Sequence, residues 1–252
     1  MNKESKKETT SFGNKIVPLG EKKSLVQGVF DEVADKYDMM NDLMSFGTHR
    51  FWKRFVVRKT RLREGDWAID VCGGTADIAI LMAKLAGEKG KVVVYDINRP
   101  MLEAGRDKGI DEGFIKNIDY VQGNAEDISF PDNTFQAATV GFGIRNVTLL
   151  KKAFKEMMRV VKPGGRVLCL EFSHVTNPVL RRFYDQFSFK VIPEIGKVVT
   201  GNKEAYEYLV ESIRKFPKQE ELKEILEDIG LYKVRFYNLF GGVAALHIGV
   251  KI

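Results

Sequence analysis

The sequence predicts an α/β fold in which helices cover both faces of a mostly parallel, seven-stranded sheet. From Asp66 onward, short runs of β-branched residues alternate with longer helical segments, which is the order that such a sheet produces. The chain has 252 residues, of which 44% are hydrophobic, so it can fill one large core. Cys72 and Cys169 lie in separate apolar runs, which excludes a disulfide framework or a zinc site with paired ligands and fits a reducing cytosol.

The individual elements follow from the spacing of apolar residues and from the turn residues between them. We expect strands at residues 67–71, 92–95, 118–121, 135–140, 166–172, 232–237 and 243–250. We expect helices at residues 75–85, from 100 onward, and at 149–160, 179–191, 204–216 and 219–229. Pro100 suits the first turn of its helix, and residues 162–165 (Lys-Pro-Gly-Gly) stop the helix before them. Gly241 and Gly242 favour a hairpin or a bulge between the last two strands.

Two helical additions are expected on this core. We predict a flexible polar tail at residues 1–23 and a single domain at 24–252, with a helical cap at 24–60 and a helical insertion at 177–216. Residues 1–11 contain no apolar segment, so we expect no secretory signal. The apolar stretches are far shorter than the ~20 residues of a membrane-spanning helix.

The net charge of the chain is +6, which favours contact with anionic surfaces such as nucleic acid or acidic lipid. However, the 40 basic residues are scattered along the chain and interleaved with 34 acidic ones. Ordinary solubility is therefore the simpler interpretation of the charge.

A ligand site is predicted at the carboxyl ends of the first two strands. Asp70 lies near the end of the first strand, and Gly73 and Gly74 allow a tight turn before a helix whose first amides are free to bind an anion. Asp96 ends the second strand, 22 positions after Gly74, where a carboxylate can accept hydrogen bonds from both ribose hydroxyls. Together they predict adenosine binding, although either feature alone is better explained as a turn or a strand end.

Two further observations refine this ligand. The loop after the first strand lacks the Gly-x-Gly-x-x-Gly pattern that accommodates a pyrophosphate, so a ligand without phosphates fits better than a nicotinamide dinucleotide. Asn124 follows the third strand and can hydrogen-bond the adenine edge, although an ordinary polar turn would also explain it. The acid-containing loop resembles the first motif of class I methyltransferases that use S-adenosylmethionine (SAM), and these enzymes have a Rossmann-like fold.

Longer segments make the resemblance more specific. Residues 37–45, continuing to His49 and Trp52, resemble the N-terminal signature of the ubiquinone/menaquinone biosynthesis C-methyltransferases, the UbiE family. Residues 159–165, followed by 171–173, are similar to the second signature of that family. The resemblance extends from about residue 29 to the C-terminus and also includes residues 143–147, 201–206 and 237–247.

The resemblance and the loop chemistry together give a set of SAM-binding residues, and no metal is expected. They are Asp70, Gly73, Gly74, Thr75, Asp96, Asn124, Ala125 and Gly141. The chain departs from the family at two positions. Gly141 stands where serine is frequent, which removes a hydroxyl contact, and Ala76 stands where glycine is common, although a Cβ disfavours positive φ.

The family reaction transfers the SAM methyl group to a ring carbon of a prenylated quinol. Ionising a ring hydroxyl at neutral pH costs about 4 kcal/mol, which a nearby cation or base reduces. Arg145 is the candidate cation for stabilising the phenolate, with a structural ion pair almost as plausible. Candidate proton acceptors are His49, Tyr37, Asp38 or a water, with His174 a weaker choice.

Other residues are assigned to the acceptor and to the membrane that holds it. Aromatic residues either line a pocket for the ring and its isoprenoid tail or simply pack in the core: Phe142, Phe172, Tyr184 and Phe187. Basic residues of the insertion are candidates for contact with anionic lipid: Arg181, Arg182 and Lys190. We therefore expect a cytoplasmic protein, with a peripheral position at the inner face of the membrane as an option.

Two rival functions remain open. One is SAM-dependent methylation of another small molecule or of nucleic acid, but residues 141–146 lack the Asn-Pro-Pro-Tyr-like motif of enzymes that methylate nucleic-acid amino groups, so no nucleic-acid partner is expected. The other is a SAM-binding component of a quinone-biosynthesis complex that does not catalyse transfer. No residue discriminates a benzoquinol from a naphthoquinol acceptor, and a homodimer or a place in such a complex remains open.

Overall fold

The core of the protein is a seven-stranded sheet, in a computed structural model that describes residues 9–33, 39, 41–42, 45, 47–191, 193–194 and 203–252. Its strands are β3 (Trp67–Val71), β4 (Lys91–Asp96), β5 (Ile118–Gln122), β6 (Phe135–Gly141), β7 (Val161–Phe172), β8 (Tyr232–Leu239) and β9 (Ala244–Val250). They lie in the order β5-β4-β3-β6-β7-β9-β8, and only β9 runs antiparallel to its neighbours. This confirms the predicted mostly parallel α/β fold.

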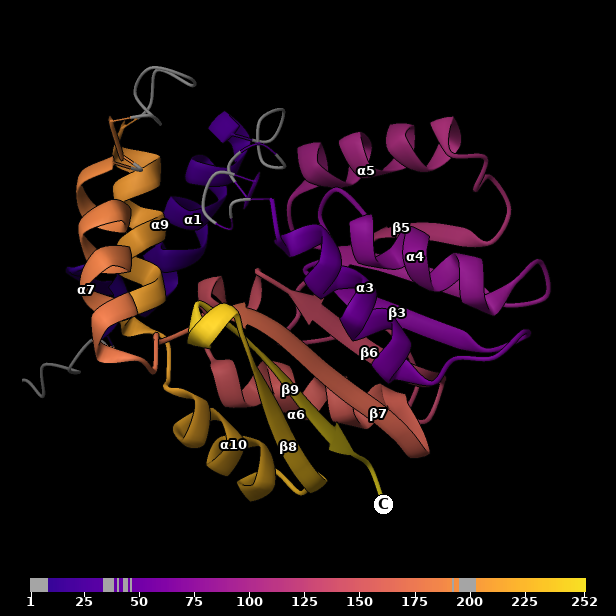
Figure 1. Ribbon diagram of the computed structural model, residues 1–252. Coiled ribbons are helices and arrows are strands. Elements are labelled where there is room, and N and C mark those ends of the chain that lie inside the picture. Colours follow the sequence, from indigo (N-terminus) through magenta and orange to yellow (C-terminus); the bar gives the residue numbers. More distant parts are fainter. Residues whose placement is uncertain are drawn as a thin grey trace, which may run out of the picture.

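Helices cover both faces of the sheet (Figure 1). One face carries α3 (His49–Thr60), α4 (Asp77–Ala86) and α5 (Arg99–Asp111), which bury residues such as Val56, Met82 and Leu102 in one core cluster. The other face carries α6 (Leu150–Val160) and α10 (Gln219–Asp228), which bury Phe154 and Leu226 in a second cluster. Each helix therefore buries its apolar stripe against the sheet, as the helical spacing predicts.

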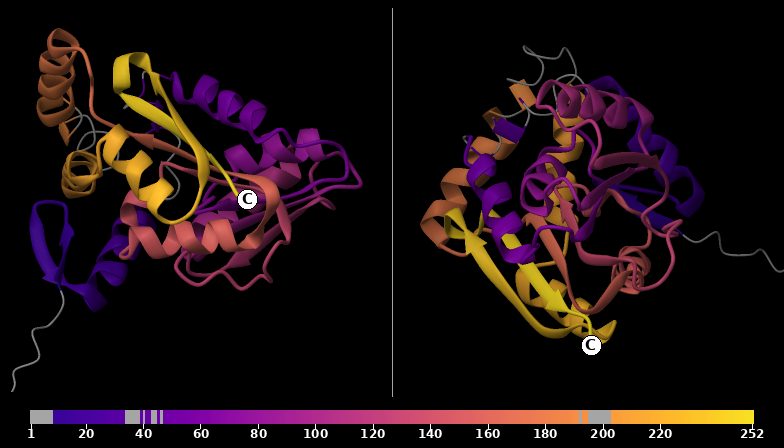
Figure 2. Two further views of the ribbon diagram at one scale, coloured as in Figure 1. Left: turned by 90° about the horizontal axis from the view of Figure 1, so that it is seen from below. Right: turned by 90° about the vertical axis from the view of Figure 1, so that its right-hand side faces the viewer.

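A layer of additional elements lies at one end of the sheet (Figure 2). It contains a hairpin of β1 (Thr9–Phe12) and β2 (Lys15–Pro18), and the helix α1 (Leu19–Val33). The insertion contributes α7 (Pro178–Gln186), the π-helical turn η3 (Phe187–Val191) and α9 (Lys203–Lys215). The N-terminal hairpin and the insertion thus lie side by side, because α9 contacts β1 as well as η3.

The N-terminal region differs from the predicted polar tail at 1–23, because residues 9–23 form the hairpin and the start of α1. The Phe12 ring stacks on Tyr208 of α9, with 4.3 Å between centroids. The backbone N–H and the side-chain amide of Asn14 donate to the Glu211 carboxylate at 2.9 and 2.7 Å. These contacts with a distant helix order a segment whose polar composition suggests a tail; residues 1–8 lie outside the described part.

The structure differs from the sequence prediction at residues 162–165 and agrees with it at the turn between the last two strands. The helix α6 ends at Val160 as expected, but residues 162–165 lie inside β7 as an irregularity rather than before it. Their position is fixed because the Gly164 N–H donates to the Lys251 carbonyl at 2.8 Å. The short 3-10 turn η4 (Phe240–Gly242) joins β8 to β9, and both of its glycines have positive φ.

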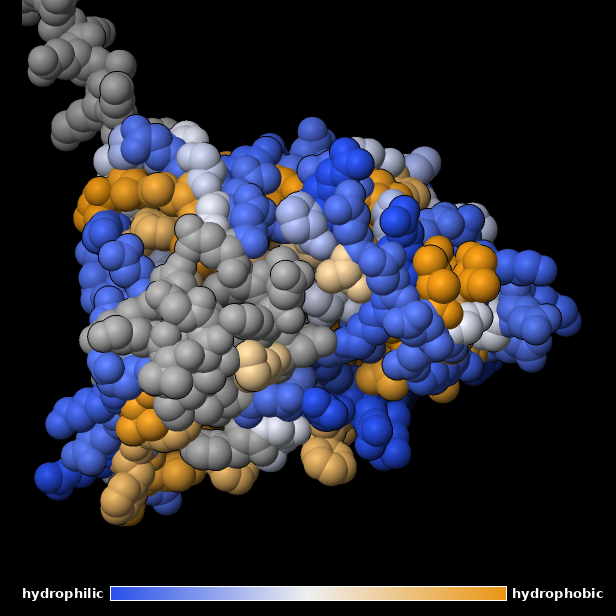
Figure 3. All heavy atoms as spheres, turned by 90° about the horizontal axis from the view of Figure 1, so that it is seen from above, coloured by the Kyte–Doolittle hydropathy of each residue, from blue (hydrophilic) through white to orange (hydrophobic). Residues whose placement is uncertain are grey.

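The described surface is mostly hydrophilic on the side that carries α1 and α5, with separate hydrophobic patches near its edges (Figure 3). Among the described helices, none combines the length and the apolar character that crossing a bilayer requires.

Candidate functional site

A cavity of about 280 Å³ lies at the carboxyl ends of the parallel strands. Its walls come from the loop after β3, the ends of β4 and β5, the loop after β6 and one side of α1. Four of the predicted SAM-binding residues border it: Gly74, Asp96, Asn124 and Ala125. The ends of three parallel strands thus bring together residues that are far apart in the sequence, as expected for a ligand site in an open α/β sheet.

The loop after β3 bends sharply through residues in the left-handed region. Cys72, Gly74 and Ala76 have φ values of 52°, 47° and 65°. A Cβ at Gly73 would lie 2.8 Å from both the Asp70 carbonyl oxygen and Val94, so this position requires glycine. Ala76 adopts the conformation that a Cβ disfavours, and it is fully buried at the start of α4. The tight turn is therefore formed even though position 76 is alanine and not glycine.

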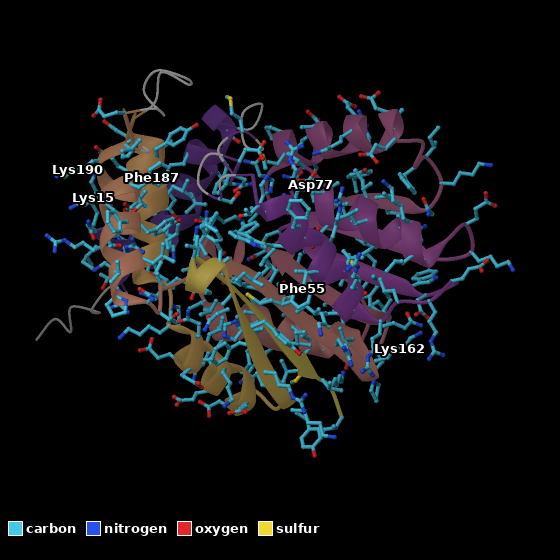
Figure 4. The ribbon with its side chains drawn as sticks, in the orientation of Figure 1. Lys15, Phe55, Asp77, Lys162, Phe187 and Lys190 are labelled. Carbon is cyan, nitrogen blue, oxygen red and sulfur yellow. The ribbon has the colours of Figure 1, made fainter. Side chains whose placement is uncertain are left out.

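Ion pairs hold the start of α4 beside this loop. Asp77, the first residue of α4, accepts from Lys53 of α3 at 2.5 Å and also pairs with Lys108 of α5. Burial acts to raise the pKa of Asp77, but the two lysines overcome it and lower that pKa to about 2. The carboxylate is therefore ionised at neutral pH and links α3, α4 and α5. Asp77 is labelled in Figure 4.

Asp96 is one of two acidic residues that border the cavity; the other is Glu126. Oδ2 of Asp96 accepts from the Gly74 backbone N–H at 2.9 Å, and its Oδ1 accepts from the Asn98 backbone N–H at 2.8 Å. Burial raises the pKa of Asp96 to about 6, against the effect of these backbone donors. A carboxylate can accept about four hydrogen bonds. Its remaining capacity, facing the cavity, suits the two hydroxyls of a ribose, so the residues present fit an adenosyl ligand.

The other four predicted SAM-binding residues do not line the cavity: Asp70, Gly73, Thr75 and Gly141. Asp70 is only 2% exposed and lies beneath the loop, where the Thr139 hydroxyl donates to it at 2.6 Å and burial raises its pKa to about 7. A Cβ at Gly141 would come within 2.4 Å of Ile78, so this isoleucine fills the space beside the position where the sequence resemblance leads us to expect serine.

The remaining wall of the cavity comes from α1, which sequence analysis assigned partly to a tail. Leu19, Val26 and Phe30 of α1 line the cavity. Lys22 donates to the Val147 carbonyl at 2.9 Å, and this bond anchors α1 to the loop after β6. The residues Leu19, Val26 and Phe30 share one helix face, and this apolar spacing is a signal that could have located the wall.

Asn98 is a second residue that sequence analysis missed. Its Oδ1 accepts from the Met101 N–H at 2.9 Å and caps α5. Its Nδ2 donates to Asp31 of α1 at 2.7 Å. Asn98 therefore joins the acid-bearing end of β4 to both helices that flank the cavity; its position just before Pro100 is a typical N-cap signal.

Arg145, the predicted phenolate-stabilising cation, lies in a buried ion pair. Its Nη1 is 2.6 Å from Oε1 of Glu171 and also donates to the Phe142 carbonyl at 2.5 Å. The side chains of Arg145 and Glu171 are 1% and 2% exposed. Burial raises the pKa of Glu171, and Arg145 opposes that effect. Arg145 does not line the cavity, although its neighbours Asn146 and Val147 do. This geometry matches the structural ion pair that the sequence left open.

Two of the candidate proton acceptors, His49 and His174, belong to the described residues, and neither lines the cavity. His49 is buried, and its Nε2 lies 2.8 Å from Oδ1 of Asp42. Burial and the nearby Lys53 lower the pKa of His49, so the ring is neutral at pH 7. His174 contacts the Phe216 carbonyl at 3.0 Å. Tyr37 and Asp38 lie outside the described residues.

The predicted aromatic lining divides into two groups. Phe142 and Phe172 are fully buried, with their ring centroids 4.6 Å apart and each 6.4 Å from Trp52. They are core residues and do not border the cavity. Tyr184 and Phe187 contact each other in the insertion, 6.5 Å apart, and Phe187 is only partly buried.

Comparison with known proteins places this chain in one family. The model of the ubiE/COQ5 methyltransferase family matches residues 17–251. A Francisella philomiragia protein named Ubiquinone/menaquinone biosynthesis C-methyltransferase UbiE is 52% identical over 251 residues, which cover 100% of both chains. A Hahella chejuensis protein of the same name is 50% identical over 98% of this chain and 99% of its own.

Solved structures support the fold. A SAM-dependent methyltransferase from Aquifex aeolicus has a TM-score of 0.59 at 21% identity, covering 79% of this chain and 89% of its own. A Thermotoga maritima SAM-dependent methyltransferase, described as a possible histamine N-methyltransferase, has a TM-score of 0.62 at 18% identity, covering 89% of this chain and 99% of its own. The fold is thus that of SAM-dependent methyltransferases, and from its sequence the chain belongs to the ubiE/COQ5 methyltransferase family.

Proposed function

We propose that this protein transfers a methyl group from SAM to a ring carbon of a prenylated quinol in ubiquinone or menaquinone biosynthesis. The observation that carries the proposal is the cavity bordered by Asp96, in a chain half identical along its whole length to proteins named for that C-methylation. Bound SAM supplies an electrophilic methyl group on a sulfonium. The residues of this chain must then hold the donor, exclude water and bring the acceptor to the methyl group.

The donor is oriented by groups that are already fixed. We assign the ribose hydroxyls to Asp96, whose carboxylate is held by two backbone amides. Asn124 and Ala125 are assigned to the adenine, because they follow β5 on the adjacent wall of the cavity. A carboxylate held in place before the ligand arrives loses little freedom on binding, which favours affinity.

One residue of the cavity wall, Cys72, could compete with the quinol for the methyl group of SAM, but its thiol is kept protonated. Cys72 borders the cavity and is a soft nucleophile. Burial and the carboxylates of Asp96 and Asp70 raise the pKa of the Cys72 thiol well above its usual value. The sulfur therefore stays protonated and unreactive at neutral pH. Apolar residues of α1, including Val26 and Phe30, exclude water, and a dry site suits a reaction in which a cation and an anion neutralise each other.

Activation of the acceptor is assigned to the loop after β6. Arg145 remains our proposed source of positive charge for the phenolate, acting from its ion pair with Glu171 and not from direct contact with the cavity. A buried guanidinium keeps its charge at any relevant pH and so contributes to the local potential without exchanging protons. The group that accepts the proton of the ring hydroxyl is a water molecule, Tyr37, Asp38 or His49.

The experiment that tests the function is mass analysis of the product. Purified protein is incubated with methyl-labelled SAM and short-chain demethylated benzoquinol or naphthoquinol. The proposal requires one labelled methyl group on a ring carbon of at least one acceptor. SAM binding without transfer to either acceptor would support the alternative of a SAM-binding component that does not catalyse transfer.

Contact with the membrane is proposed through α7, because the acceptor is a membrane lipid. Val179 and Phe183 are one helical turn apart and 68% and 67% exposed, and Arg182 is exposed between them. Lys190 lies on the same insertion (Figure 4). Exposed aromatic and basic side chains on one helix suit the interface of an anionic membrane.

Sedimentation with anionic vesicles tests this surface. We expect Arg182→Glu/Phe183→Ser to reduce vesicle binding severalfold, because it removes one cation and one apolar anchor. The matched control is Ile115→Ser, which replaces a residue that is 71% exposed in the segment after α5, away from the insertion. Equal binding of the parent and the α7 variant would contradict the proposed surface.

A further inference from the structure

A second concave region lies at the opposite edge of the sheet from the SAM cavity. It is a groove of about 1050 Å³ formed by the end of α3, the turn before β3, the start of β7 and the strand β8. Lys162, marked in Figure 4, is one of its residues. Because the parallel strands begin here, the sheet separates this groove from the carboxyl ends that border the SAM cavity.

The groove is strongly cationic. Its basic residues are Arg58, Lys59, Arg61, Arg63, Lys162, Arg166, Lys233 and Arg235. Its acidic residue is Asp66, and Oδ2 of that carboxylate already accepts from the Arg63 backbone N–H at 2.7 Å. Across the described ranges of the chain, no carboxylate lies within 4.0 Å of the charged nitrogens of these eight side chains; the nearby Glu64 and Asp119 are within that distance of Lys89 and Lys91 instead.

Several of these cations are held in place by contacts other than carboxylates. Arg166 donates from Nη1 to the Lys59 carbonyl at 2.8 Å. The Lys59 ammonium lies over the rings of Phe55 and Tyr237, at 5.1 and 4.7 Å from their centroids. Lys233 covers Tyr232 in the same way, at 5.1 Å. The groove therefore presents ordered positive charge that its single described wall carboxylate, Asp66, does not balance.

Two of the guanidinium groups repel each other. Burial lowers the pKa of Arg166, and the charge of Arg61 lowers it further. Like charges held close together are unfavourable unless an anion lies between them. Basic residues at the C-terminus of a helix balance the helix dipole, which accounts for Arg58 and Lys59. It does not account for the cations that β7 and β8 contribute.

We propose that this groove binds an oligophosphate group, two or more linked phosphates carried by one soluble ligand. Guanidinium forks match the oxygens of phosphate, and eight cations facing one carboxylate suit several negative charges. A concave site fits such a ligand better than the flat surface of a membrane. Nucleic acid is less suitable, because Lys59 and Lys233 already lie over the groove rings of Tyr237 and Tyr232, which reduces the ring surface on which bases could stack.

Calorimetry on the full chain with inorganic triphosphate tests the proposal. The groove variant is Arg61→Gln/Lys233→Gln, which removes two exposed cations from two different walls. The control is Lys152→Gln/Lys155→Gln, which removes the same charge from the exposed side of α6. We expect saturable binding to the parent, binding about tenfold weaker or more for the groove variant, and little change for the control. SAM affinity should be equal in all three, which verifies the fold.

Equal triphosphate affinity of the groove variant and the control would overturn the proposal. It would also be overturned by phosphatidylglycerol vesicles or a single-stranded oligonucleotide that bind through the groove while triphosphate does not bind. The first of these results would identify a membrane surface and the second a nucleic-acid site. Neither outcome affects the proposed methyl transfer, because no groove residue borders the SAM cavity.

Discussion

The two edges of the sheet handle charge in opposite ways. At the carboxyl edge, Arg145 is paired with Glu171 and both are buried, while Asp96 is held by backbone amides. At the amino edge, eight cations surround a groove with one carboxylate. The difference indicates that the charges of Arg145 and Glu171 belong to the folded framework, whereas the cations of the groove lack carboxylate partners within 4.0 Å among the described residues. Substitutions at the two edges should therefore affect stability very differently.

The largest effect on stability is expected for Arg145→Met. Removing one partner leaves the Glu171 carboxylate buried without its cation, which lowers the free energy of unfolding by about 3–5 kcal/mol. The double variant Arg145→Met/Glu171→Leu should regain much of this loss. Urea denaturation measures both. A single variant within about 1 kcal/mol of the parent would contradict the structural role assigned to the pair.

The double variant also separates structure from catalysis. If its turnover falls far more than its SAM affinity once stability has been regained, Arg145 acts on the acceptor as well. If turnover returns with stability, the pair only positions the loop between β6 and α6.

The next effect concerns Asp70 and pH. In the unfolded chain an aspartate ionises near pH 3.8, whereas burial raises the pKa of folded Asp70 to about 7. The stabilisation from this raised pKa is complete below pH 3.8 and is lost as the pH rises towards 7, by at most about 4 kcal/mol. Asp70→Asn should therefore match the parent near pH 4 and exceed its stability increasingly up to pH 7. A difference in denaturation that does not change with pH would exclude a buried, titrating carboxyl at this position.

A smaller effect, on binding rather than stability, is expected for Asp96→Ala. Loss of two hydrogen bonds to ribose, at about 1.5 kcal/mol each, weakens SAM binding about 100-fold. Calorimetry with SAM checks this value, and Asp111→Ala, an exposed acid at the end of α5, is the control. Unchanged SAM affinity in Asp96→Ala would remove the basis for the donor site.

The smallest effect is expected at the amino edge. Arg61→Gln relieves the repulsion of Arg166 and should raise the free energy of unfolding by about 0.5 kcal/mol at low salt. The gain should vanish in about 1 M NaCl, where surface charges are screened. A loss of stability comparable to that of Arg145→Met would show that the two edges do not differ as described.

Features that depend on neighbouring residues in the sequence could be predicted. The strands β3 and β4, the turn at Gly73 and Gly74, and the carboxylate of Asp96 are local patterns, and the structure places Gly74 and Asp96 together at 2.9 Å. The burial of Asp70 could not be predicted in the same way. It depends on Thr139, which is 69 positions away and packs beside it on β6.

Features assembled from distant segments were not predictable by pattern. The cationic groove combines residues 58–63, 162–166 and 233–235, so its charges look scattered in the sequence. The hairpin before α1 is ordered by α9, about 200 residues later: Asn14 bonds Glu211, 197 positions away. Polar composition alone therefore suggested a tail, because the contacts that order it leave no local signature.

The wall formed by α1 has a practical consequence for anyone who manipulates the N-terminus. Leu19 and Phe30 border the cavity, while the preceding hairpin rests on α9. Removing the residues before α3 would remove the α1 wall of the cavity, together with the hairpin that contacts α9. Truncated preparations should therefore be tested for donor affinity before any loss of turnover is attributed to the reacting groups.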